Sequence, residues 1–98
     1  MNLKYLRKNL KELSETLDIK FSYTFILLYA YHSETFSNNE VVAQVPFGCE
    51  TISQGIRRLS RIGLINRVKG GGGKNKLKAL YSISGKGKIK IKKLYLNL

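Results

Sequence analysis

Leucines recur within residues 1–20 at the spacing of one face of a helix. They lie three, four, three and four positions apart, at Leu3, Leu6, Leu10, Leu13 and Leu17. The spacing predicts an N-terminal helix with a single apolar seam. Two heptads are too short to hold a coiled coil alone, so the seam must pack either on its own domain or on a partner subunit. These leucines are therefore the candidate dimer contact.

The next segment is apolar around nearly its whole circumference, which predicts a buried helix from Ser22 to about Ser33. Either Asp18 or Ser22 is expected to cap its start, because short polar side chains accept the first free N–H groups of a helix. Its aromatic residues are Tyr23, Phe25, Tyr29 and Tyr31. Core packing explains them better than a ligand pocket does, since aromatic side chains dominate ordinary cores.

A short helix and a turn are predicted before residue 49. Ser37, followed three residues later by Glu40, is a capping box, and it opens a helix that runs to about Gln44. Pro46 ends this helix because its ring disfavours helical geometry in the residue before it. The turn passes through Gly48. Together with the helix that follows, this pattern predicts a helix-turn-helix.

The longer helix of the pair is predicted over residues 50–62, with Gly63 as the left-handed residue that terminates it. At about 100° per residue, its core face carries Ile52, Ile56 and Leu59. The opposite side carries Gln54, Arg57, Arg58 and Arg61, with Glu50, Thr51 and Ser53 near its start. Arginine suits guanine edges and phosphates, and glutamine can pair with adenine. The pattern favours a recognition helix in the major groove over a basic face that is merely soluble.

Two short strands, LINRVK and LKALYSI, flank the stretch GGGGKNK and predict a β-hairpin. Alternation places Leu64 or Ile65, Val68, Leu80 and Ile83 on the core side. The basic residues that project outward or lie at the tip are Arg67, Lys69, Lys74, Lys76 and Lys78. We expect these residues to contact nucleic acid as a wing.

The four glycines do not make a nucleotide-binding loop. A Walker motif needs serine or threonine after Gly73-Lys74, but Asn75 follows, and Val68 stands where the first glycine belongs. The spacing of a dinucleotide fingerprint also fails. No nucleotide or other cofactor is expected.

The tail, residues 84–98, fits two patterns. Its apolar residues nearly alternate with polar ones, as in a strand, but Ile91, Leu94, Tyr95 and Leu98 also form a helical stripe that Ser84 could cap. The residues leave strand and helix open.

Charge is distributed unevenly along the 98 residues. Residues 1–50 carry five basic and six acidic residues, whereas residues 51–98 carry thirteen basic residues and no acidic one. A positive field on one half of a small domain favours a polyanion, with nucleic acid ahead of anionic membrane. The longest mostly apolar stretch, residues 21–31, is too short to span a bilayer, and no signal peptide is apparent. We expect a cytoplasmic protein without a membrane partner.

Candidate catalytic groups are few. Cys49 and His32 are the only cysteine and the only histidine, and the six carboxylates are scattered along the chain. A zinc site, a disulfide within the chain and a paired acid/base are therefore not expected. The chain is predicted not to be an enzyme but to bind specific double-stranded DNA. The alternative is a structural protein that coats DNA, or binds RNA, without sequence preference.

Residues 23 to about 93 resemble the winged helix-turn-helix regulators of the MarR-like kind. The resemblance rests on ETISQGIRRLSRIGLINRV, which is similar to that superfamily's recognition helix running into a strand, and on YSISGKGK, which is similar to its strand exit. It departs from the pattern where Lys86, rather than an acidic residue, precedes Gly87.

The resemblance implies an α+β, mostly helical fold, a winged helix-turn-helix with a two-stranded hairpin and helical termini. The length of 98 residues suits one domain. We expect it to cover residues 1–98, with an N-terminal helix (1–20), a winged-helix core (21–83) and a C-terminal segment (84–98). The resemblance also implies a homodimeric transcription regulator whose terminal helices pair. The residues facing DNA would be Thr51, Ser53, Gln54, Arg57, Arg58 and Arg61, with Lys74 and Lys76 at the wing tip. A small-molecule effector is left undetermined.

Overall fold

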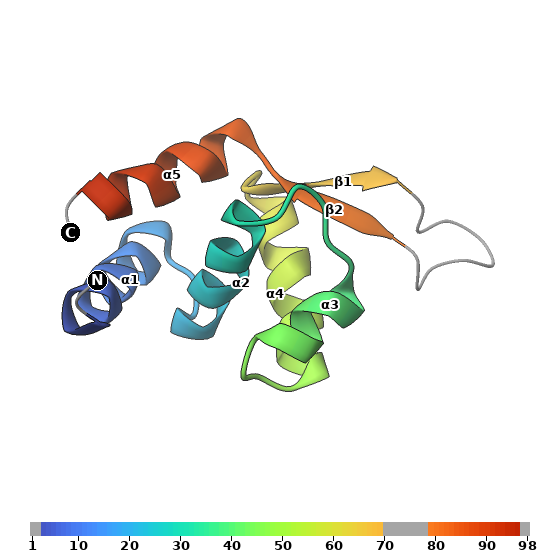
Figure 1. The fold of residues 1–98 in the computed structure, drawn as a ribbon, viewed down its shortest axis with the longest axis horizontal. Coiled ribbons are helices and arrows are strands. Elements are labelled where there is room, and N and C mark those ends of the chain that lie inside the picture. The colour runs from blue at the N-terminus through green and yellow to red at the C-terminus, as the bar shows by residue number, and fades with distance from the viewer. Residues whose placement is uncertain (1–2, 70–78, 97–98) are drawn as a thin grey trace.

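A computed structural model describes residues 3–69 and 79–96. Within them the chain forms five helices and one two-stranded antiparallel sheet. The elements follow in the order α1 (Leu3–Leu17), α2 (Phe21–Tyr31), α3 (Asn38–Gln44), α4 (Cys49–Arg61), β1 (Ile65–Lys69), β2 (Leu80–Ile83) and α5 (Gly85–Leu96) (Figure 1). The predicted α+β, mostly helical fold with a helix-turn-helix and a hairpin is confirmed.

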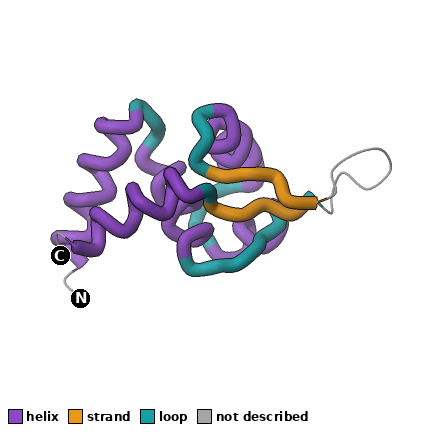
Figure 2. The backbone as a smooth tube through the Cα atoms, turned by 90° about the horizontal axis from the view of Figure 1, so that it is seen from above, coloured by secondary structure: helices purple, strands orange, loops and turns teal. Residues whose placement is uncertain are grey.

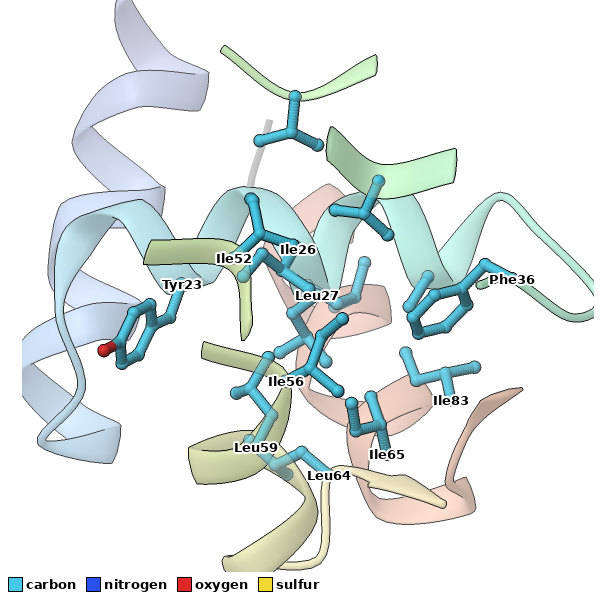
Figure 3. Packing of buried hydrophobic residues seen from close by; sticks show 14 residues of the cluster. Tyr23, Ile26, Leu27, Phe36, Ile52, Ile56, Leu59, Leu64, Ile65 and Ile83 are labelled. Carbon is cyan, nitrogen blue, oxygen red and sulfur yellow. The ribbon is translucent and has the colours of Figure 1, made fainter. Parts of the chain in front are cut away.

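Helix α2 is the centre of the domain. It packs against α1, α4, α5 and β2, and its Ile26, Leu27 and Ala30 are completely buried. Figure 3 shows Ile26 and Leu27 facing side chains from α4 and the sheet. Because other elements cover α2 on several sides, the helix is apolar around nearly its whole circumference, as the sequence indicated.

The predicted cap of α2 is wrong. The residue that precedes the helix is Lys20, and no side chain caps it. Asp18 instead adopts a left-handed backbone with φ of 54°, a conformation that aspartate tolerates better than most residues. Only three residues connect α1 to α2. Asp18 is the first of them, and its left-handed backbone turns the chain at the end of α1 instead of capping the start of α2.

The leucine seam of α1 packs largely on its own chain. Leu10 is 2% exposed, and Leu13 and Leu17 pack against the core cluster. Of the two alternatives for the seam, packing on its own domain therefore accounts for these three residues. Leu3 and Leu6 lie in the first turns of α1, and their contact with a partner stays a prediction.

The helix-turn-helix follows its sequence signals closely. The Ser37 hydroxyl accepts a hydrogen bond from the Glu40 backbone N–H at 3.2 Å and caps α3. Gly63, with φ of 81°, follows α4. A side chain in place of Gly55 would collide with Ile26 and Tyr23 of α2, so this glycine lets the two helices approach closely.

The sheet contains an irregularity that the sequence pattern does not show. Ile65 pairs with Ile83, and both are buried, but the register shifts between Arg67 and Lys69. Such a bulge inserts one extra residue and ends the strict alternation of faces. Val68 is this extra residue and is 55% exposed, so its predicted core position is wrong.

A second pairing on the sheet was not predicted. Phe36, in the connection between α2 and α3, exchanges two backbone hydrogen bonds with Tyr81 of β2, at 2.9 and 2.8 Å. Its ring is buried and lies against the rings of Tyr29 and Tyr81. This bridge ties the start of the helix-turn-helix to the hairpin.

The tail is a helix. Ile91 is completely buried whereas Ile89 is 56% exposed, although alternation in a strand would place both on one face. Ser84 caps the helix by accepting a hydrogen bond from the Gly87 N–H at 3.1 Å, and its hydroxyl donates to the Gly63 carbonyl at 2.7 Å. Figure 2 shows the start of α1 and the end of α5 at the opposite end of the molecule from the two strands.

Candidate nucleic-acid interface

Helix α4 carries most of the predicted DNA-facing residues. Gln54, Arg57 and Arg61 are exposed, on the side of the helix away from the buried Ile52 and Leu59. They lie within about 60° of one another around the axis, at 100° per residue. One glutamine and two arginine side chains therefore share one outward face of α4.

The remaining candidates on α4 lie on its flanks. Ser53 is half-buried on the side toward α3 and the sheet, whereas Thr51 and Arg58 are half-buried on the other side, next to Gly55 and α2. Arg57 and Arg58 therefore point about 100° apart. Six candidates that are close in sequence divide into a central face and two edges.

A hollow of about 500 Å³ lies between α4, α3 and the hairpin. It brings Arg57 of α4 together with Arg67 of β1, two residues that the sequence placed in separate elements. Its other lining residues are Asn38, Ser53, Ile56, Ser60 and Tyr81. The Arg67 guanidinium, with the hydroxyl donors beside it, suits an anion such as a phosphate oxygen. Arg57 borders the same hollow from the outward face of α4.

One hydrogen bond fixes the wall of this hollow. The Asn38 side-chain amide donates to the Ser53 hydroxyl at 3.0 Å. Asn38 begins α3 and Ser53 lies in the second turn of α4, so the bond joins the two helices of the helix-turn-helix. It holds Ser53 beside the outward face of α4.

Asn38, Ser60 and Tyr81 were not among the residues predicted for the interface. Ser60 shares the flank of α4 that holds Ser53, so a helical projection could have found it. Asn38 and Tyr81 reach the hollow only through packing between elements, and no local signal in the sequence marks them.

The wing is described only at its base. Arg67 is exposed on β1, and Lys69 is the last residue of that strand. Lys74, Lys76 and Lys78 lie outside the described residues, as does the predicted hairpin tip. Contacts from these lysines to nucleic acid stay a prediction.

Three further observations concern metal-binding, thiol and membrane-spanning features of the described residues. Residues 3–69 and 79–96 contain no group of three histidine, cysteine, aspartate or glutamate side chains that could hold a metal ion. Cys49 is exposed at the start of α4. None of the described helices has both the length and the apolar character to cross a membrane.

Comparison with known proteins is informative at the level of structure alone. No protein-family model matches the chain, and no curated protein is significantly similar to it. A MarR family regulator from Neisseria meningitidis superposes with a TM-score of 0.67 at 18% identity, over 85% of this chain and 57% of that one. AbfR in a disulfide-formed state superposes with a TM-score of 0.73 at 13% identity, over 95% of this chain and 62% of the other.

These similarities confirm the fold that the resemblance implied. The chain spans about three fifths of the length of the two solved proteins. At identities of 18% and 13% the likeness concerns architecture, and the order of helices, turn and hairpin described above agrees with it. The protein has the winged-helix fold of the MarR family regulators.

Proposed function

We propose that this protein is a sequence-specific double-stranded DNA-binding protein and a homodimeric transcription regulator. Residues 50–62 enter the major groove, where Gln54, Arg57 and Arg61 contact bases. Arg58, Thr51 and Ser53 contact the edges of the groove or the phosphates beside it. The wing, residues 69–78, lies on the minor groove or the backbone.

The outward face of α4 is the observation that carries this proposal. Its exposed side chains are Gln54, Arg57, Arg61 and, at the helix start, Glu50, which is the one carboxylate in α4. Beyond the first turn of the helix this face carries no acidic residue. A face whose only task is solubility commonly mixes both signs along its length. Arginine and glutamine are also the side chains that pair bidentately with guanine and adenine.

Selection of bound sequences from a random pool of duplexes tests the proposal. We expect an enriched motif with two-fold symmetry, because a symmetric dimer presents two identical recognition helices. Binding without any enrichment would contradict sequence-specific recognition. It would support the alternative, a protein that coats nucleic acid.

The alternative has one observation in its favour. Five lysines lie on α5, away from the helix-turn-helix, and phosphate contacts of this kind carry no sequence information. Binding that does not depend on sequence would not need glutamine and arginine side chains placed to pair with base edges on α4. For this reason we place specific recognition first.

A further inference from the structure

Helix α5 presents a basic face that the proposed recognition site does not use. Its sequence is GKGKIKIKKLYL, with five lysines and no acidic residue. Lys86, Lys92 and Lys93 are exposed around Ile89, which is itself 56% exposed. The buried side of the helix is marked by Gly87 and Ile91. The outward face is therefore almost entirely cationic, and we call Lys86, Ile89, Lys92 and Lys93 the α5 face.

The α5 face is separated from the recognition helix by the core of the domain. Helix α2 packs against both α4 and α5. Figure 1 shows α5 along the upper edge of the domain, and α3 with the start of α4 along the lower edge. The end of α5 also lies far from the hairpin, at the other end of a molecule 43 Å long. Phosphates beside α4 and the wing are therefore not the natural partners of this face.

A second copy of the same face is a poor partner as well. If a two-fold axis passed through the α5 face, its three lysines would lie opposite the same three lysines of the partner. Like charges brought together in this way oppose association. An anionic membrane is disfavoured along residues 85–93, because a helix lying on a bilayer needs a broad apolar face. Among these residues, whose side chains the structure describes, Ile89 is the one large apolar side chain that is exposed.

We propose that the α5 face binds the phosphate backbone of a second DNA duplex, so that one protomer bridges two DNA segments. The first segment lies on α4 and the wing, as proposed above, and the second lies across α5. Lysine binds phosphate as a point charge without reading sequence. The second contact is therefore independent of sequence and strongly sensitive to salt.

A capture experiment measures bridging directly. One short duplex is immobilised on beads, a second, fluorescent duplex is in solution, and the protein is added at increasing salt. The test variant is Lys86→Ala/Lys92→Ala/Lys93→Ala, and the matched control replaces the same three lysines with arginine. Circular dichroism confirms that both variants fold, and fluorescence anisotropy measures the affinity for a single duplex.

We expect the alanine variant to lose at least about tenfold in captured duplex at moderate salt, because each lost phosphate contact removes about 0.9 from the salt slope. Its affinity for one selected duplex should change by less than about threefold, since α4 is untouched. The arginine variant should bridge as the original protein does. Unchanged bridging by the alanine variant would overturn the proposal. It would mean that a dimer can hold the two duplexes with its two α4 helices, without any contact from α5.

Two further outcomes also decide against it. Equal loss of bridging and of single-duplex binding would mean that α5 contacts the same DNA as α4. Binding to phosphatidylserine vesicles that depends on the three lysines, without bridging, would assign the face to membrane. An Arg57→Ala/Arg61→Ala variant separates this question from the proposed function: it should lose sequence preference but keep binding that depends on the α5 lysines.

Discussion

Arg57 and Arg67 come from different elements but line the same hollow, and their expected roles differ. Arg57 lies on the outward face of α4, from which a side chain can reach base edges in the major groove. Arg67 lies on the strand beside that helix, where the backbone of the same DNA would pass. One residue is thus suited to reading sequence and the other to holding the duplex in register.

Alanine substitutions should separate these two roles. Arg57→Ala should weaken binding to the selected motif by about 1–3 kcal/mol and relax specificity at one base position. Arg67→Ala should weaken all sequences alike and lower the salt slope by about one unit. Titration of selected and scrambled duplexes at several salt concentrations measures both. Arg7→Ala, at an exposed position on α1, is the control and should change neither; equal losses on both duplexes for Arg57 would show that it does not read sequence.

At the scale of elements, local signals predicted the helix-turn-helix well. Ser37 and Gly63 act at the helix ends where their residue types belong. The tail could not be settled, because Ile89 and Ile91 fit a strand equally well, and only the buried position of Ile91 against the core decides for a helix. The exposure of Val68 was missed because the sequence left open whether Leu64 or Ile65 begins the alternation. The strand begins at the buried Ile65, which places Val68 on the opposite face, and the bulge beside it depends on how the two strands pair.

The docking of α5 depends on a glycine whose role was not evident in the sequence. A side chain at Gly87 would collide with the Leu64 backbone carbonyl and come within 2.7 Å of Ile83 Cγ1. A backbone carbonyl cannot move aside as the end of a side chain can. The second glycine of the YSISGKGK motif, Gly87, is thus required by the close approach of α5 to the start of the sheet.

Gly87→Ala should therefore reduce the free energy of unfolding by about 2 kcal/mol, as overpacking does in other cores. Gly85→Ala is the matched control in the same helix, because nothing lies within 4 Å of the position that its side chain would take. It should be neutral or stabilise the protein by up to about 1 kcal/mol through helix propensity. Urea denaturation measures both variants, and similar stabilities for the two would refute the packing argument.

At the scale of the whole molecule, the basic residues that the structure describes within 51–69 and 79–96 are divided between two surfaces. Helix α4 and the base of the wing form one, and α5 forms the other, with the nearly neutral first half of the chain contributing α1 and the central α2. The leucine seam of α1 is partly used within the protomer. Helix α1 packs against α5, and Figure 1 shows the start of α1 away from α4 and the hairpin. A dimer contact through the start of α1 would therefore leave α4 and the base of the wing open to nucleic acid.

Dimerisation makes a geometric prediction about the DNA site. Two recognition helices that enter successive major grooves must lie about 34 Å apart, so the half-sites of the selected motif should be centred about 10 base pairs apart. Inserting about five base pairs between the half-sites turns one of them to the opposite side of the duplex. Affinity should then fall toward that of a single half-site, as measured by titration of labelled duplexes with sedimentation to establish the number of subunits bound. Affinity that does not depend on the spacing would mean that each protomer binds alone, and the two-fold arrangement proposed here would be wrong.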